Sequence, residues 1–229
     1  MLLAAAAPPP ALVRIAGPEL RETFADPKAL HDGVSLLGFS KDGKIALVLE
    51  PADEACGCYL ARVFVQDLRT DKIVFTEDVH GFPGKPKDPH DLASLWVLRG
   101  AAWSAKLAEL GIDLAAHPAL AATAGTAEDP ITFAVQPENK PETAEMPGLS
   151  SQAIRVRRAA GAKTVHTDRW NDDAPSPLET RILGCLKSPF EERIAIVYAE
   201  KWPGYEGPPN VIRVKVTGAT LGSGFKKPE

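Results

Sequence analysis

Apolar positions between residues 34 and 217 fall into short runs and alternating stretches separated by turn residues, which is the pattern of β-strands. Residues 45–49 form a continuous apolar run of strand length, and Asp42-Gly43 before it is a strong hairpin signal. Similar runs predict strands at 34–39, 62–68, 72–75, 131–135, 153–157, 163–167, 181–186, 194–198 and 211–217. The strands up to residue 75, joined by short turns, predict an antiparallel meander.

One segment carries helical periodicity instead. The residues Leu92, Leu95, Trp96, Trp103, Leu107 and Leu110 recur near the spacing of one helix face. We therefore expect one main helix over about 89–110, with Asp88 as its N-cap, Pro89 in the first turn and Gly111 at its end. Gly100 should weaken the middle of this helix by about 1 kcal/mol relative to alanine.

Two parts of the chain are similar in sequence. Residues 37–41 read Leu-Gly-Phe-Ser-Lys and residues 183–187 read Leu-Gly-Cys-Leu-Lys, and an Ile-Ala-x-Val run follows each of them. Chance similarity among β-rich segments would give the same observation. If the similarity is structural, two similar β units pack as a sandwich or as one larger sheet, and the helix covers one sheet face.

These patterns predict a mainly β (α+β) fold with antiparallel strands in a single domain over 31–221, interrupted by a helical and loop insertion at about 78–150. Residues 1–30 are rich in proline and predict an extended arm or the remnant of a secretory signal. An apolar stretch followed by the small residues Ala4 to Ala7 favours the signal, although no basic residue precedes it. Residues 222–229 predict a loose polar tail.

Composition narrows the possible function classes. The 229 residues are 45% apolar and 24% charged, which is ordinary for a globular protein. A net charge of −4 and a pI near 5.8 lead us to expect no nucleic-acid partner. No apolar run approaches the roughly 20 residues that span a bilayer, so we expect no membrane span. A Gly-x-Ser-x-Gly motif and a phosphate-binding loop are both absent, and we expect neither a cofactor nor catalytic residues.

The cysteines are Cys56, Cys58 and Cys185. Three cysteines do not supply the four soft ligands of a structural zinc site, so no metal is expected. Two interpretations remain open. The cysteines are small buried residues, or Cys185 forms a disulfide with Cys56 or Cys58 after export to an oxidising compartment.

The loop from Trp202 to Pro209 holds two aromatic residues among prolines and glycines. A rigid aromatic loop loses little entropy on binding, so Trp202, Tyr205 and Glu206 are candidates for contact with a protein or glycan partner. The alternative is a tight connection whose rings pack back on the sheet.

Two other clusters of histidine and carboxylate residues are candidate sites. His80, His90 and Asp91 could serve a hydrolase or a metal, although their spacing matches no known motif. Asp168, Asp172 and Asp173 suggest a calcium loop, but the glycine and glutamate of that motif are missing, which favours a solvated acidic turn.

Several segments carry a family resemblance: 38–44 (Gly-Phe-Ser-Lys-Asp-Gly-Lys), 65–68, 108–112 and above all 203–208 (Pro-Gly-Tyr-Glu-Gly-Pro). With them the chain resembles, over about residues 34–219, a family of predicted secreted bacterial proteins of unknown function. The resemblance implies export and no particular activity.

We therefore expect an exported, non-catalytic β-rich protein, periplasmic or secreted by a bacterium. It would bind a protein partner in the cell envelope or act as an accessory subunit of an envelope assembly. The alternatives are a hydrolase with its site near His80, His90 and Asp91, and a purely structural cytoplasmic domain.

Overall fold

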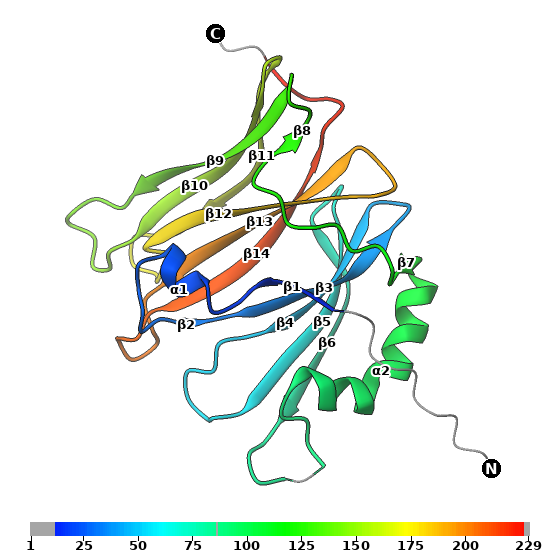
Figure 1. Ribbon diagram of the computed structural model, residues 1–229. Helices are drawn as coiled ribbons and strands as arrows, with labels where there is room; N and C mark the ends of the chain where they lie inside the picture. Colours follow the sequence, from blue (N-terminus) through cyan, green and yellow to red (C-terminus); the bar gives the residue numbers. More distant parts are fainter. Residues whose placement is uncertain (1–11, 86, 227–229) are drawn as a thin grey trace.

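The computed structural model describes residues 12–85 and 87–226 and is mainly β, as the sequence predicts (Figure 1). The first sheet runs β1 (Val13–Ala16), β3 (Gly33–Ser40), β4 (Lys44–Glu50), β5 (Tyr59–Asp67), β6 (Lys72–Gly81), with β7 (Ile112–Asp113) beside β3. The second sheet runs β12 (Glu179–Lys187), β13 (Arg193–Trp202), β14 (Val211–Thr220), β2 (Leu30–His31). The third runs β11 (Gly161–Arg169), β10 (Leu149–Arg158), β9 (Pro130–Asn139), β8 (Ala124–Gly125). The helices are α1 (Leu20–Thr23) and α2 (Leu92–Glu109).

Helix α2 and the three sheets form successive layers around three apolar cores. The core between α2 and the first sheet includes Leu37, Val48, Val63, Leu95, Trp96, Trp103 and Leu107. The core between the first and second sheets includes Leu36, Phe39, Ile45, Leu47, Leu186, Val197 and Ile212. The core between the second and third sheets includes Ile154, Val156, Cys185, Ile194, Ile196 and Tyr198. The predicted sandwich is therefore confirmed, with a further sheet added on one side and the main helix on the other.

The sequence similarity between residues 37–49 and 183–198 is structural. The β3–β4 pairing shifts register between Leu36 and Gly38, and the β12–β13 pairing shifts between Ile182 and Gly184. Both glycines have positive φ angles, +155° and +150°, at which a side chain is strained. A carbonyl oxygen also approaches each of them, so that an added Cβ would lie 2.1 Å from Asp113 O and 2.7 Å from Ala121 O respectively. Each unit thus uses a glycine bulge to admit a neighbouring segment.

The two units stack front to back. Ile45 and Leu47 of β4 face the second sheet, whereas the matching Ile194 and Ile196 of β13 face the third sheet. The opposite face of β13, with Val197, packs on the first sheet. Both units are stacked in the same orientation, and each is apolar on both faces. The outer apolar face at each end of the stack therefore has to be covered by another element. Helix α2 covers one end, and the third sheet closes the other with a polar outer face.

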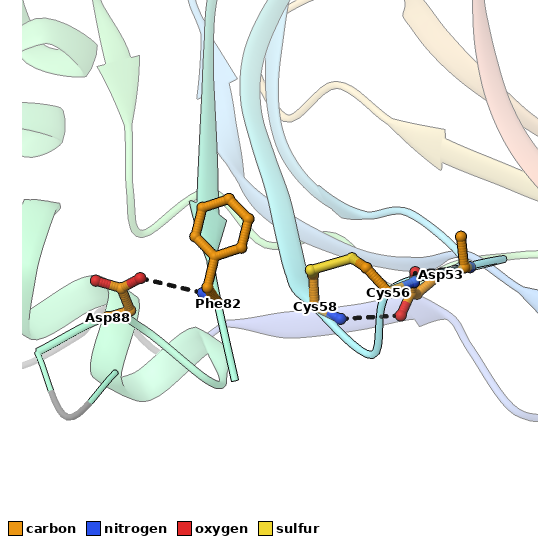
Figure 2. The surroundings of a disulfide bond; sticks show 6 residues. Asp53, Cys56, Cys58, Phe82 and Asp88 are labelled. Carbon is orange, nitrogen blue, oxygen red and sulfur yellow. Dashed lines mark hydrogen bonds between the residues drawn. A yellow bond between two sulfur atoms is a disulfide. The ribbon is translucent and has the colours of Figure 1, made fainter. Parts of the chain in front are cut away.

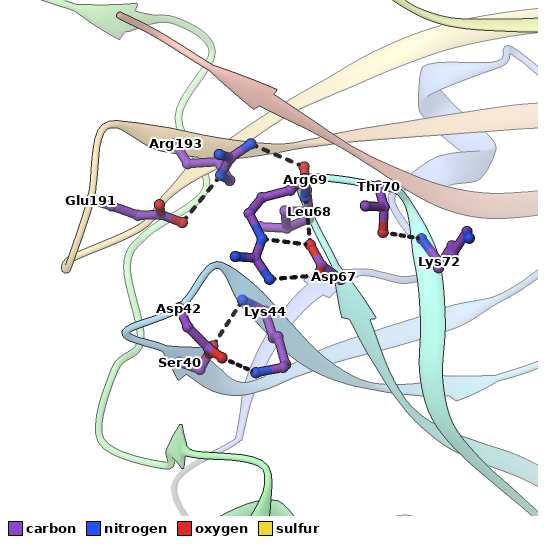
Figure 3. Close-up of polar contacts among 10 residues, drawn as sticks. All are labelled: Ser40, Asp42, Lys44, Asp67, Leu68, Arg69, Thr70, Lys72, Glu191 and Arg193. Atoms are coloured by element: carbon purple, nitrogen blue, oxygen red, sulfur yellow. Dashed lines mark hydrogen bonds and ion pairs between the residues drawn. The ribbon is translucent and has the colours of Figure 1, made fainter.

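The β5–β6 turn joins the first unit to the second (Figure 3). Arg193 Nη1 of β13 donates to Leu68 O at 3.3 Å. Within the turn, Arg69 contacts the Asp67 carboxylate through two nitrogens, at 3.1 and 2.8 Å. Gly218 of β14 lies so close to the turn that an added Cβ would be 1.8 Å from Leu68 O. The turn is therefore fixed against the second sheet, and this fixes the position of Asp71, which follows in the turn.

Helix α2 begins later than predicted, and its cap is Asp91. The Asp91 carboxylate accepts from Ser94 N at 2.7 Å, and Ser94 Oγ accepts from Asp91 N at 3.2 Å, which completes a capping box. Asp88 instead accepts from Phe82 N at 3.1 Å and closes the preceding loop. Gly100 has a packing role, because a Cβ there would lie 2.5 Å from the Trp96 ring.

The expected arm and tail are more ordered than the sequence predicts. Residues 13–31 form β1, α1 and β2, and they bury Leu20 and Phe24 in the core between the first two sheets. At the other end, Lys226 pairs with Ala162 of β11. Phe225 packs there against the Lys163 ammonium, whose nitrogen lies 4.6 Å from the ring centre. The expectation of an arm or signal remnant covers residues 1–30, and its first part, residues 1–11 with Ala4 to Ala7, lies outside the described residues, as do residues 227–229.

The insertion between the two units is shorter than the predicted 78–150. Strand β6 continues to Gly81, and β9 begins at Pro130 as a full member of the third sheet. The predicted strand at 131–135 is confirmed within β9. The remaining residues between the sheets include α2 and the segment whose Ala121 pairs with Cys185.

Candidate functional site

A cleft of about 600 Å³ lies beside strand β14, between β5 and β6 of the first sheet and β11 of the third. It forms because β14 is almost an edge strand. Its neighbour β2 covers only Val211 and Ile212, and in the described part of the chain no strand pairs with the following residues of β14 on that side. The inner faces of the first and third sheets extend past this edge and form the two walls.

The wall from the first sheet mixes apolar and polar side chains. Its apolar lining residues are Leu49, Phe64 and Ile73 from β4, β5 and β6, and Val214 and Val216 of β14 lie at its base. Its polar lining residues are Arg62, Gln66, Thr76 and Asp78. Strand alternation brings the two valines to this side, facing the core between the first and second sheets. Ile73 is 51% exposed, so an apolar side chain of this wall is open to solvent.

The wall from the third sheet carries paired charges. His166 and Asp168 lie on the inward face of β11, and His166 Nε2 is 3.0 Å from Asp168 Oδ1. Lys215 of β14 reaches both this pair and a buried carboxylate. Its Nζ lies 3.9 Å from Asp168 Oδ2 and 3.0 Å from Glu200 Oε2. The wall therefore presents a histidine, a lysine and two carboxylates in mutual contact.

The charged wall shifts the pKa values of its own members. Burial alone would raise the pKa of Asp168, but the contacts with His166, Gln152 and Lys215 outweigh it and lower that pKa to about 2. In return, the Asp168 carboxylate raises the pKa of His166 above its usual value, against the opposing effect of burial. Asp168 is thus ionised throughout the physiological range, and the ion pair with His166 persists to higher pH than for an exposed histidine.

Glu200 anchors this wall from below. Its side chain is fully buried and accepts hydrogen bonds from Gln152 Nε2 at 2.8 Å, Trp202 Nε1 at 2.9 Å and Lys215 Nζ at 3.0 Å. The donors come from β10, β13 and β14. A buried carboxylate needs partners of this kind, because leaving it unpaired would be costly. The network therefore holds Lys215 in place at the base of the cleft.

A further ion pair lies on the first-sheet side of the cleft. Arg62 of β5 contacts Asp78 of β6 through two nitrogens, at 2.6 and 3.1 Å, and both residues line the cavity. This bidentate geometry fixes both side chains. The arginine lowers the pKa of Asp78, so this pair too is charged at neutral pH.

Side chains close most of the exposed edge of β14. Asp32 Oδ2 accepts from Val214 N at 2.9 Å, and Gln66 Nε2 donates to Val216 O at 3.0 Å. Asp71 Oδ1 then accepts from Gly218 N at 2.7 Å. Asp71 adopts a left-handed backbone conformation with φ +56° at the fixed β5–β6 turn. These three residues satisfy backbone groups that would otherwise recruit another strand.

The predicted loop at Trp202–Pro209 separates into a structural and an exposed part. Trp202 packs edge-on against Trp170, with ring centres 6.2 Å apart, and the Arg213 guanidinium lies 4.9 Å from its ring. Together with its bond to Glu200, these contacts give Trp202 a packing role. Tyr205 is 91% exposed and Glu206 is also exposed. None of the three lines the cleft.

The predicted pairing of Cys185 is wrong. Cys56 and Cys58 are bonded to each other (Figure 2). Cys185 is a free thiol. Cys185 lies on β12 in the core between the second and third sheets, whereas the other two lie on the loop before β5. Burial raises the pKa of the Cys185 thiol to about 11. Asp53 organises the disulfide loop by accepting from Cys56 N at 3.1 Å and Cys58 N at 2.9 Å.

The structure does not gather His80, His90 and Asp91 into one constellation. His80 lies on β6, and Asp91 is engaged as the cap of α2. His90 lines a separate concavity of about 560 Å³ next to the disulfide loop, and His80 does not. Across residues 12–85 and 87–226, there is no group of three or more histidine, cysteine or carboxylate side chains that could hold a metal ion.

The acidic segment also separates. Asp168 belongs to β11 and to the cleft wall, whereas Asp172 and Asp173 are exposed in the following turn. The buried Lys140 holds this turn by donating to the carbonyl oxygens of Asp172, at 3.2 Å, and Ala174, at 2.6 Å.

Sequence reasoning missed His166, Lys215 and Glu200. The sequence does mark them, because each is a charged or polar residue at a strand position that alternation turns inward, where an apolar residue is the usual choice. A lysine and a glutamate at inward positions of adjacent strands predict an internal ion pair. Nothing in the sequence shows that β11 lies across from them.

The comparisons with family models, with curated proteins and with solved structures give no match. In the described part of the chain, no helix has the length and apolar character needed to cross a membrane. The function must therefore be argued from the cleft itself.

Proposed function

We propose that the chain is an exported, non-catalytic binding module, and that its ligand occupies the cleft beside β14. The observation that carries this proposal is the composition of the cleft, whose volume is about 600 Å³: the apolar side chains Leu49, Phe64 and Ile73 of the first sheet face the charged side chains of the third. Binding sites commonly combine an apolar lining with a few placed polar groups. The cleft suits a ligand with one apolar side and one polar side.

The pairing of the charges favours binding over catalysis. A catalytic acid or base must exchange its proton with a substrate. In this cleft both ring nitrogens of His166 face carboxylates, Nε2 at 3.0 Å from Asp168 and Nδ1 at 4.0 Å from Asp71. Lys215 is engaged by Glu200, and Arg62 by Asp78. These contacts fix side chains in place and neutralise them, which suits recognition.

The Cys56–Cys58 disulfide supports export. Disulfides persist in oxidising compartments such as the bacterial periplasm and are rare in the cytosol. The resemblance to predicted secreted bacterial proteins favours the same localisation. Within the envelope, a module of this kind would serve as a partner-binding or accessory subunit. Tyr205 and Glu206, both exposed, would provide a second contact outside the cleft.

A capture experiment tests the use of the cleft. The tagged chain is cross-linked in the envelope fraction of its host, and the captured molecules are identified by mass spectrometry. Thr76→Trp places a bulky ring in the cleft from an exposed position on β6. Thr164→Trp makes the same change at an exposed position on β11 that does not line the cleft, and serves as the matched control.

We expect a stoichiometric partner with the parent chain and with Thr164→Trp, and its loss with Thr76→Trp. Capture that is unaffected by Thr76→Trp but lost with Tyr205→Ala would contradict the assignment to the cleft and favour the loop. Recovery of the chain from the cytosol with Cys56 and Cys58 reduced would contradict export.

A further inference from the structure

The base of the cleft holds a backbone donor and acceptor without partners. Within one strand, the N–H and C=O of a residue point to the same edge, and successive residues alternate. Asp32 accepts from Val214 N, and Gln66 donates to Val216 O. The backbone N–H and C=O groups of the even-numbered residues of β14 therefore point toward the cleft edge. The remaining groups of this pair are Val214 C=O and Val216 N–H. Among the described residues neither has a hydrogen-bond partner on this edge.

This donor and acceptor match the backbone of one residue in a parallel strand. In parallel pairing, a residue donates its N–H to the carbonyl before its partner and accepts from the N–H after its partner. Here the partner would be Lys215. The chain already uses this arrangement one step earlier, because β2 runs parallel to β14 with Leu30 N bonded to Asn210 O at 2.9 Å. Strand β2 leaves the edge at Asp32, and the next position is open.

We propose that the cleft binds an extended peptide segment, which adds to β14 as a short parallel strand in line with β2. This inference rests on the proposed function and names the ligand class. The peptide residue opposite Lys215 would donate to Val214 C=O and accept from Val216 N–H. Addition of a strand to an exposed sheet edge is an established mode of peptide recognition.

The two walls determine which side chains such a peptide carries. Side chains of laterally paired residues point to the same face of a sheet, so the central peptide residue faces the charged wall beside Lys215. The residues before and after it face the first-sheet wall, where Phe64 and Ile73 supply apolar contacts. Since His166 and Lys215 already have carboxylate partners, an additional charge gains little there, and an uncharged polar side chain is favoured. The expected pattern is apolar, uncharged polar, apolar.

The flanking caps limit the length of the added strand. Asp32 occupies the edge on one side of the open position, and Gln66 and Asp71 occupy it on the other. Only about three consecutive peptide residues can therefore lie along β14. The caps also explain how the edge remains available to a short ligand without pairing with a long strand from another chain.

Synthetic peptides test this inference with the purified full chain. The probe is fluorescein-labelled Ser-Gly-Val-Thr-Val-Gly-Ser, and its binding is followed by fluorescence anisotropy. N-methylation of the central threonine removes the N–H that would bond to Val214 C=O. N-methylation of the valine after it removes an N–H that points away from β14, and serves as the control. A second peptide, Ser-Gly-Thr-Val-Thr-Gly-Ser, exchanges the two faces.

We expect saturable binding of the first peptide, about tenfold weaker binding after threonine N-methylation and little change after valine N-methylation. The face-exchanged peptide should also bind about tenfold more weakly, because its single valine would face the charged wall. Thr76→Trp should abolish binding, and Thr164→Trp should not. Equal binding of the two N-methylated peptides, or no saturable binding, would overturn the inference.

The peptide result and the capture result separate the two proposals. If Thr76→Trp removes a partner in the capture experiment while no peptide binds, the cleft is a binding site for another ligand class and only strand addition fails. If Thr76→Trp leaves capture unchanged, the proposed function itself fails.

Discussion

Replacing Gly38 or Gly184 by alanine should destabilise the protein strongly, because each glycine admits a neighbouring carbonyl at the bulge of its unit. An added Cβ would lie 2.1 Å from Asp113 O at Gly38 and 2.7 Å from Ala121 O at Gly184. Real Cβ atoms do not approach so closely, so the backbone must move. The φ angles of +155° and +150° add conformational strain.

The magnitude follows from these two contributions. Backbone strain costs about 1–3 kcal/mol and overpacking about 1–3 kcal/mol, so each substitution should lower the free energy of unfolding by about 2–6 kcal/mol. Gly38→Ala should cost more than Gly184→Ala, because its contact is shorter. Gly57→Ala is the control. Its φ is +63°, and no atom of the described residues lies within 4 Å of an added Cβ, so the substitution carries only the left-handed penalty of about 1–2 kcal/mol.

Urea denaturation followed by tryptophan fluorescence measures the three values. For a chain of this length, 1 kcal/mol corresponds to about 2–4 °C in Tm, so thermal melting provides a second measurement. A cost for Gly38→Ala or Gly184→Ala no larger than that for Gly57→Ala would refute the argument. In that case the two bulges would not be equivalent close-packed sites.

Three further predictions concern single side chains. The Asp168 carboxylate raises the pKa of His166, so the stabilising contribution of His166 is fully present below about pH 6.5 and is lost as pH rises through the folded-state pKa. Urea titrations at several pH values should show that the free energy of unfolding falls more steeply across this range for the parent than for His166→Asn. Asp71→Ala removes an acceptor shared by Gln66, Thr217 and Gly218 and should cost about 2–3 kcal/mol in the same assay, whereas Asp71→Asn should cost less. Asp91→Ala removes the N-cap of α2 and should cost about 0.5–2 kcal/mol, with faster amide exchange confined to the first turn of that helix.

Local pattern was enough to predict the longer strands and the main helix, but not the short strands β1, β2, β7 and β8. Alternation and turn residues located the strands at 45–49, 194–198 and 211–217, and the repeated Leu-Gly segment identified the second unit. Local pattern could not predict the direction of stacking. The same alternating run is compatible with either face inward, and only the tertiary arrangement sends Ile45 to the second sheet and Ile194 to the third.

The prediction of a loose arm and tail was wrong for the described residues near the chain ends, because their ordering depends on contacts with residues far away in the sequence. Residues 13–31 have no strong periodicity of their own, yet Leu20 and Phe24 fill the core between two sheets. Phe225 likewise finds its place between the cations of Arg158 and Lys163. Proline-rich or polar composition indicates little local preference for helix or strand. Tertiary contacts nevertheless order both segments here.

The candidate site was predictable only in its parts. Glu200 and Lys215, charged residues at inward strand positions, indicate an internal ion pair. Asp168 was a candidate as part of the acidic cluster with Asp172 and Asp173. The cleft arises because, among the described residues, no strand continues from β2 along the edge of β14. Strand order of this kind cannot be read from local sequence. The cysteine pairing failed for a related reason, since nothing in the spacing shows that Cys185 lies in a different core from the disulfide loop.

An NMR titration of the ¹⁵N-labelled chain with Ser-Gly-Val-Thr-Val-Gly-Ser places the ligand on the structure. The Val216 amide should show the largest downfield shift because it gains a hydrogen bond, with smaller changes at Lys215 and His166 and none at Tyr205. Perturbations centred on residues 203–207, or an unchanged Val216 amide at saturating peptide, would contradict the assignment of the cleft as the binding site.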